Sequence, residues 1–380
     1  MVIERRKFLV LVASIVKGSF LYTLAQSKVA HGQVLLYASA CENQQGGFEV
    51  VCFPPDGTST SKIMLPDRGH SITMRPNETE AILFARRPGT FAIAFHPGTG
   101  RLIQSLGSHQ GRCFCGHGVF EPEGRLVYAT ENDFENGRGV IGVYDANENY
   151  RRIKEIPSHG IGPHEIKLYP NGQTLVVANG GILTHPELPR VKMNLPTMES
   201  SLCYINRENG KLLAKFSLPE QFRQLSIRHI DINSAGIVGI AMQYKGPSGN
   251  LVPLIGMHDG SRQIMLIDEP HSVIRSMKNY CGSIAFDSSG EVLAVSSPLG
   301  GCVTFWDTTA PDFLSSVNIK DVCGISPSTN NGEFLVSGRG TLAFVQARSG
   351  QKELLALAAY DDIQWDNHLS VGVGTTQPQI

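Results

Sequence analysis

The chain has 380 residues and a formal net charge of −1, and only 18% of its residues are charged. It carries no basic excess and no block of like charge, so its composition argues against a nucleic-acid partner. Its 40 glycines and 21 prolines favour a turn-rich all-β protein over a helical one. No Pro/Ser-rich linker or low-complexity stretch divides the sequence, and we therefore expect one large domain.

The N-terminal residues have the pattern of an export signal. Arg5 and Arg6 precede a short apolar run, and Ala25-Gln26-Ser27 offers small residues for cleavage. A paired arginine in this setting is typical of a twin-arginine signal peptide. The alternative, an uncleaved membrane anchor, is disfavoured by Lys17 and by the shortness of the apolar run. We expect residues 1–27 to be removed, leaving a periplasmic protein with no stable membrane span.

Repeated units follow the signal. Residues 34–38 predict a strand, and the unit that begins at His117 predicts strands over residues 118–120, 125–130, 139–145 and 151–156. Asn, Asp and Gly recur between the strands because tight turns require positive φ. Short strands between regularly spaced turn signals are typical of a β-propeller.

A histidine returns at the start of one unit after another. Two further units start with a cysteine, so seven equivalent positions follow one another at intervals of 42 to 65 residues. Periods of this size indicate repeated copies of one structural unit. The seven positions are His70, His117, His164, His229, Cys281, Cys323 and His368.

The two ends of the repeated region complete each other. Residues 34–38 resemble the second strand of a unit, and residues 368–371 supply its missing first strand. Pairing between these segments removes an exposed sheet edge. The sequence therefore predicts an all-β, seven-bladed β-propeller over residues 34–371, closed by its N- and C-terminal strands, with a tail at 372–380.

The repeat starts predict a functional site. In a propeller, the first residues of the inner strands and the loops after the second strands share one face, so the repeat starts gather at the mouth of the central channel. Imidazole and thiolate are ligands that Zn, Cu and Fe bind. For each histidine, a hydrogen bond that holds one blade to the next is the alternative. We predict a transition-metal site (Fe, Cu or Zn) formed by His70, His117, His164, His229 and His368, and a ligand-binding rim formed by Arg87, Glu131, Asn179, His185, Arg228 and Gln243.

The eight cysteines match no small disulfide framework. We expect most of them to be buried apolar fillers, and the sequence leaves their pairing open. Cys113, Cys115 and His117 alternate along one stretch, so a strand would turn all three side chains to one side. A metal role for this group and a loop conformation without one remain alternatives.

Five motifs are specific enough to carry a resemblance: Gly116-His117-Gly118-Val119-Phe120, Gly162-Pro163-His164-Glu165, Val177-Ala178-Asn179-Gly180-Gly181, Ile227-Arg228-His229 and Trp365-Asp366-Asn367-His368. They resemble an exported bacterial family of unknown function, the domain of unknown function 1513. The resemblance covers the chain from about residue 35 to residue 370. It implies a seven-bladed propeller and, through genes often found beside the family's own, a link to imelysin-type iron-uptake proteins of the periplasm. It supplies no catalytic residue.

Two further functions remain open besides a metal-binding protein of iron acquisition. The first is a hydrolase or lyase that acts on a small anionic or sugar-like substrate through Arg87, Glu131, Asn179 and His185. The second is a scaffold that docks a protein on the face of the channel mouth, because one fold serves many functions.

The export signal gives a first testable prediction. Replacing Arg5 and Arg6 together by Lys should block export, because the twin-arginine machinery reads that pair. Immunoblots of periplasmic and cytoplasmic fractions measure the effect, and Lys7→Arg serves as the control. An unchanged periplasmic yield in the double variant would contradict the predicted localisation.

Overall fold

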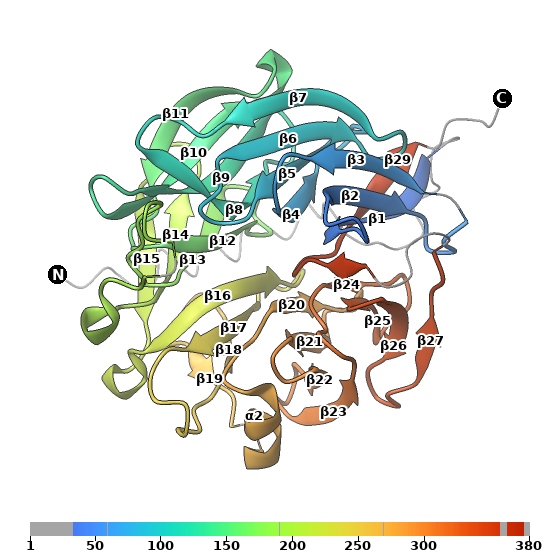
Figure 1. Ribbon diagram of the computed structural model, residues 1–380. Helices are drawn as coiled ribbons and strands as arrows, with labels where there is room; N and C mark the ends of the chain where they lie inside the picture. The colour runs from blue at the N-terminus through green and yellow to red at the C-terminus, as the bar shows by residue number, and fades with distance from the viewer. Residues whose placement is uncertain (1–32, 59, 190, 269, 358–362, 376–380) are drawn as a thin grey trace.

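The fold is a seven-bladed β-propeller, in a computed structural model that describes residues 33–375 except 59, 190, 269 and 358–362. Seven separate antiparallel sheets surround one central axis (Figure 1). We number the blades 1 to 7 in chain order from the first strand. The predicted signal peptide, residues 1–27, lies outside the described residues.

Blades 1 to 4 are built from the N-terminal half of the chain and the last two strands. Blade 1 contains β1 (Gln33–Glu42), β2 (Phe48–Phe53), β3 (Ser61–Leu65), β28 (Gln364–Trp365) and β29 (Ser370–Thr375). Blade 2 contains β4 (Gly69–Met74), β5 (Ala81–Ala85), β6 (Phe91–His96) and β7 (Arg101–Gly107). Blade 3 contains β8 (Arg112–Phe120), β9 (Leu126–Asp133), β10 (Arg138–Asp145) and β11 (Arg151–Pro157). Blade 4 contains β12 (Pro163–Leu168), β13 (Thr174–Asn179), β14 (Ser201–Asn206) and β15 (Leu212–Ser217).

Blades 5 to 7 complete the ring. Blade 5 contains β16 (Leu225–Ile232), β17 (Val238–Tyr244), β18 (Ile255–His258) and β19 (Met265–Leu266). Blade 6 contains β20 (Ser283–Phe286), β21 (Val292–Ser297), β22 (Cys302–Asp307) and β23 (Phe313–Asn318). Blade 7 contains β24 (Ile325–Pro327), β25 (Glu333–Gly338), β26 (Thr341–Gln346) and β27 (Lys352–Leu354). The helical segments are η1 (Ala146–Glu148), η2 (Leu195–Thr197), η3 (Glu220–Phe222) and α2 (His271–Met277).

The hydrophobic core lies between neighbouring blades. In blade 4 every residue of β13 is buried, whereas the outermost strand, β15, alternates between half-buried and exposed positions. Phe84 of blade 2 packs against Phe114 of blade 3, with 5.8 Å between the ring centres. Middle strands are therefore covered on both faces and read as continuous apolar runs, while outer strands keep a solvent face and alternate.

The C-terminal strand closes the ring. β29 pairs antiparallel with β1, with Val371 opposite Tyr37 and Ser370 opposite Ala38. β29 also contacts the inner strands of both neighbouring blades, β4 and β24. The predicted closure is confirmed, and β29 runs beyond the predicted end at Val371 to Thr375. The first residues of the predicted tail therefore belong to blade 1.

The structure adds one helix that the repeat pattern did not predict. It is α2, which precedes blade 6 and packs Val273 and Met277 into the core. No helix among the described residues is long and apolar enough to span a bilayer.

Closure gives a prediction on stability. Deleting residues 365–380 removes β29 and leaves β1 as an open edge, so the variant should unfold at a lower temperature and aggregate. Size-exclusion chromatography and thermal unfolding measure both effects. Deleting only residues 376–380 is the matched control. A monomeric variant with the melting temperature of the full chain would contradict this account.

Candidate metal centre

The local backbone explains why the histidines face the channel. The pairing register shifts at the histidine in three successive inner strands, β4, β8 and β12, and in β16 it shifts at Arg228, immediately before His229. Such a β-bulge inserts an unpaired residue and re-aims its side chain. Gly116 makes one bulge possible: its φ is +102°, and a Cβ there would lie 2.4 Å from the ring of His70.

The five predicted histidines lie in one cluster. All five are buried, and eight pairs of their rings have centres 4.5 to 5.8 Å apart. They come from blades 1 to 5, so five of the seven blades each contribute one ring to the cluster. We call this group the histidine cluster. Its members are His70, His117, His164, His229 and His368.

Two overlapping trios in the histidine cluster have the spacing of a metal site. One comprises His70, His117 and His368, and the other His117, His164 and His229. Within each trio, one nitrogen per ring lies within 4.8 Å of the others. Three ring nitrogens are buried without a hydrogen-bond partner, namely Nε2 of His117, Nδ1 of His164 and Nε2 of His368. Lone pairs at such nitrogens are available to a metal ion.

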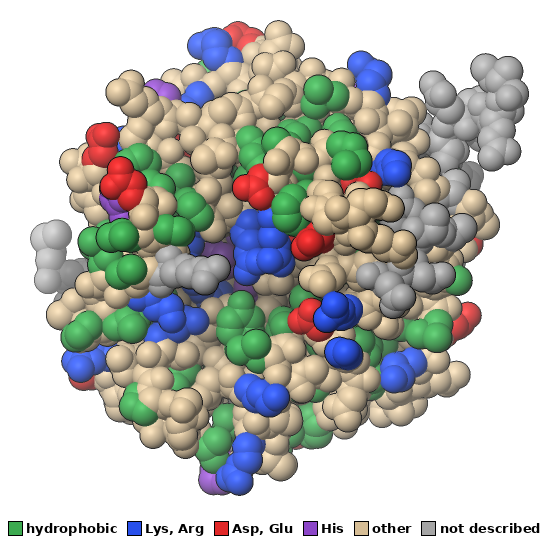
Figure 2. Space-filling view, in the orientation of Figure 1, with side chains coloured by type: hydrophobic (Ala, Val, Ile, Leu, Met, Phe, Trp, Pro, Cys, Tyr) green, Lys and Arg blue, Asp and Glu red, His purple; other side chains and the backbone are tan. Residues whose placement is uncertain are grey.

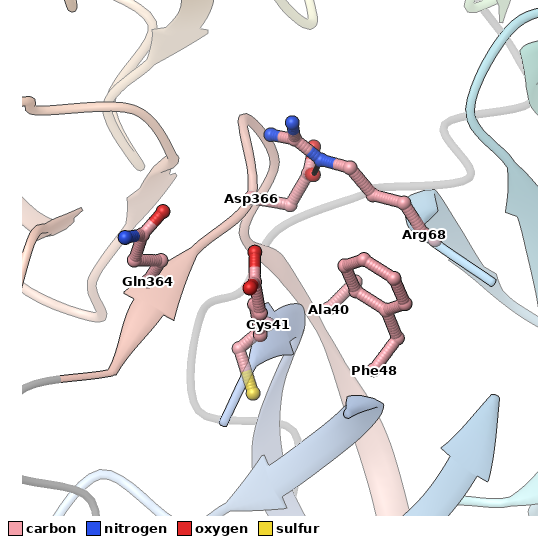
Figure 3. Close-up of a pocket in the computed structure, with 8 residues that line it drawn as sticks. Ala40, Cys41, Phe48, Arg68, Gln364 and Asp366 are labelled. Atoms are coloured by element: carbon pink, nitrogen blue, oxygen red, sulfur yellow. Dashed lines mark hydrogen bonds and ion pairs between the residues drawn. The ribbon is translucent and has the colours of Figure 1, made fainter. Parts of the chain in front are cut away.

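Two buried carboxylates orient the rings. Asp366 lies 3.0 Å from Nδ1 of His70, and the guanidinium of Arg68 covers its other oxygen (Figure 3). Glu165 lies 3.2 Å from Nδ1 of His229 and accepts a hydrogen bond from the backbone of Ile230. Carboxylates that hold the second nitrogen of an imidazole fix the orientation of metal-binding histidines.

The charges of this arrangement are set by burial. Burial lowers the pKa of His117, His164 and His368 well below the ordinary value, and in all three neighbouring histidines add to the effect. Burial acts against ionisation of Asp366, yet the hydrogen bond from His70 and the charge of Arg68 hold its pKa at about 2. These three imidazoles are therefore neutral beside an ionised carboxylate, which is the state in which imidazole binds metal.

The small cavity beside Asp366 is no ligand pocket. Its volume is about 10 Å³, room for roughly one water molecule, and it lies between Cys41, Phe48 and Gln364 (Figure 3).

The cysteines take no part in the histidine cluster. All eight are described and buried, and they form no disulfide. The prediction that Cys281 joins the ring was wrong, because its side chain packs in the apolar core. Cys113 and Cys115 lie in β8, not in a loop, and burial raises the pKa of Cys113 to about 11. Neutral buried thiols make poor metal ligands.

Three of the predicted rim residues lie close together at the blade 5 side of the channel mouth. Arg228 follows Ile227 in the bulge of β16, one residue before His229. Gln243 lies on the neighbouring strand and accepts a hydrogen bond of 2.7 Å from Lys245. Arg87, in the loop after β5, is close enough to lower the pKa of both Arg228 and Lys245, although burial is the larger cause.

The other three predicted rim residues make different contacts. Glu131 accepts hydrogen bonds from Tyr144 and Arg152 inside blade 3. Asn179 is fully buried and donates to the backbone of Ser158. His185 lies on the long loop of blade 4, where its ring meets Phe134. Glu131 and Asn179 were expected in the loops after the second strands, but Glu131 lies within β9 and Asn179 is the last residue of β13.

Sequence reasoning missed three residues of the site. Asp366 and Glu165 each stand beside a cluster histidine in the chain, at positions −2 and +1, and this proximity was the available signal. Lys245 lies in the loop after β17, where only its neighbour Gln243 had been predicted.

Comparison with known proteins identifies the family. A family model described as "Protein of unknown function (DUF1513)" matches residues 63–372. The chain belongs to this family. The matched region contains every residue of the histidine cluster, with Asp366 and Glu165, so the site lies within the family domain.

Among solved structures, the chain is similar to one titled Kuenenia stuttgartiensis Hydrazine Synthase. The two share 11% identity and a TM-score of 0.58, over 84% of this chain and 95% of that one. At this identity the similarity concerns the fold alone. No curated protein matches the chain.

Burial of the imidazoles predicts a loss of stability in acid. In chelator-treated protein, the free energy of unfolding should fall as pH drops below about 6.5, where unfolded imidazoles take up protons. The folded chain does not take up these protons, because burial keeps the pKa of His117, His164 and His368 well below that value. Each such ring should cost up to about 1.4 kcal/mol per pH unit.

Denaturant titrations from pH 7.5 to 5.5 measure this dependence. His368→Gln should reduce the slope by about one proton, because Gln does not titrate. An equal slope in the variant and the parent protein would contradict the assignment of a neutral, buried imidazole.

Proposed function

We propose that this protein is an exported, periplasmic β-propeller that binds one transition-metal ion at the histidine cluster and serves in iron acquisition. The observation that carries the proposal is the convergence of five buried rings with three unpartnered nitrogens. An unpaired buried polar atom is costly, and a bound ion would satisfy two of the three nitrogens, those of His117 and His368 in one trio or those of His117 and His164 in the other.

The donor set favours a divalent transition metal. Neutral imidazole suits Zn, Cu, Fe and Ni, whereas Mg and Ca prefer oxygen ligands. Our candidates are therefore Fe, Cu and Zn. Three histidines leave a coordination position for an outside ligand, as in zinc sites that act on a bound molecule.

We expect one ion per chain. The two trios share His117, whose Nδ1 lies 3.8 Å from Glu165 and whose Nε2 has no partner. A single available nitrogen cannot serve two ions at bonding distance. An ion in either trio therefore excludes one in the other.

Role and location are supported by other observations. The pair Arg5-Arg6 supports export to the periplasm. The resemblance to a family encoded beside imelysin-type proteins supports iron acquisition and partners among periplasmic iron-uptake proteins. A catalytic role has less support, because Glu131, Asn179 and His185 make contacts away from the histidine cluster.

Elemental analysis tests the metal site. Protein exported and purified without a tag should contain about one equivalent of transition metal. His117→Ala should lose it, since both trios use this ring. His185→Ala is the matched control, because this histidine lies at the surface loop and should leave the metal content unchanged.

Circular dichroism keeps the test interpretable. The His117→Ala fold should survive, with a melting temperature close to that of metal-free parent protein. Two results together would contradict the proposal: a parent protein that contains no metal as purified, and a lowered melting temperature in each single histidine variant. They would favour hydrogen bonding between blades as the role of the histidines.

A further inference from the structure

Cations without an ion-pair partner gather on the face of the channel mouth. Figure 2 shows Lys and Arg side chains at the centre of the molecule, beside a hollow in which histidine is visible. Among the described residues, none of the following forms an ion pair within 4 Å: Arg86, Arg87, Lys192, Arg228 and Lys245. A protein of net charge −1 has carboxylates to pair with them, so their isolation here needs an explanation.

Arg228 is the most informative of these residues. Its side chain belongs to a residue only 7% exposed, and both Nε and Nη1 are buried without a partner. Nη1 lies over Gly180, where an added Cβ would be 2.9 Å away. A buried guanidinium without an anion is strongly unfavourable. The side chain is therefore arranged for an anion that comes from outside.

Lys245 lies next to it. In the sheet, Gln243 of β17 pairs with Ser226 of β16, two residues before Arg228. The ammonium of Lys245 donates to Gln243 and lies 5.6 Å from the centre of the Tyr280 ring.

We propose that Arg228, Lys245 and Arg87 form a subsite for a small multivalent oxyanion, a polycarboxylate or an inorganic phosphate-like ion, beside the histidine cluster. Arg228 is suited to this because its planar fork binds carboxylate or phosphate through two parallel hydrogen bonds. The small exposed fraction of Arg228 favours a small anion over the surface of a macromolecule at this position.

The subsite also bears on metal binding, and this part of the inference rests on the proposed function. Arg228 precedes His229 in β16, so an anion held by Arg228 lies beside the trio of His117, His164 and His229. Three imidazoles leave a coordination position open, and an oxyanion can fill it. The protein then binds the metal together with an anionic ligand.

Calorimetry with metal-free, chelator-treated full-length protein tests the subsite apart from the metal. Citrate, phosphate and sulfate are titrated separately at neutral pH. We expect at least one to bind with a stoichiometry of one, and Arg228→Gln to weaken it by at least tenfold. Binding of citrate alone would identify the ligand class as a polycarboxylate. Binding of phosphate and sulfate would identify it as an inorganic oxyanion. Arg262→Gln, an exposed arginine at the opposite end of blade 5, is the control.

Proton uptake provides a second readout. Burial, together with the charges of Arg228, Lys192 and Arg87, lowers the pKa of Lys245 to about 6. The ring of Tyr280 also lies against this ammonium. A bound anion raises the pKa of Lys245, so above pH 6 the binding of an anion is accompanied by the uptake of at most one proton. Anion affinity therefore falls as the pH rises. Sulfate titrations in two buffers of different ionisation enthalpy measure the uptake, which Lys245→Met should abolish.

The outcomes separate the two proposals. No binding of any of the three anions, or equal binding by Arg228→Gln and the parent protein, overturns the subsite. A protein that binds anion but never metal keeps the subsite and overturns the metal centre. For a protein that binds both, the metal affinity should rise at least tenfold in the presence of the bound anion, and an unchanged affinity overturns their coupling.

Discussion

The pairing of β29 with β1 is the constraint on which the rest of the structure depends. It converts a row of blades into a ring, and it also carries the segment that precedes β29 to the centre. Asp366 and His368 belong to that segment. His368 completes a trio whose other rings come from blades 2 and 3, and Asp366 contacts His70 of the same trio. Closure of the fold and completion of the site are therefore one structural event, so an open ring would lack both.

Burial without compensation shapes the chemistry at the centre. Five imidazoles have been taken out of water with only two carboxylates against them, Glu165 and Asp366, and three ring nitrogens are left unpartnered. A few ångströms along β16, Arg228 is buried without an anion. The unpartnered nitrogens of the histidine cluster suit a cation, and the guanidinium of Arg228 suits an anion. A metal ion with an anionic ligand would satisfy both deficits, which is why the two features are best understood together.

The repeat was predictable because its signals are local. Turn glycines such as Gly124 and Gly172 adopt positive φ as expected, and the histidines mark the inner strands. The rim was less predictable, because a strand's end depends on how far its partner continues to pair. β9 runs on to Asp133 opposite β10, and so Glu131 lies in a blade instead of a loop. Cys281 occupies an equivalent position in the repeat, yet in its blade the thiol lies against apolar neighbours. Sequence spacing cannot show whether a repeat start faces the channel or the core.

X-ray absorption at the metal edge tests the central claim most directly. On metal-loaded protein, the account predicts a first shell with about three imidazole nitrogens near 2.0–2.1 Å, together with the outer-shell scattering of the rings. A metal bound by water or carboxylate would show an oxygen shell without ring scattering. Such a spectrum, or one with sulfur at about 2.3 Å, would contradict a site built from the histidine cluster.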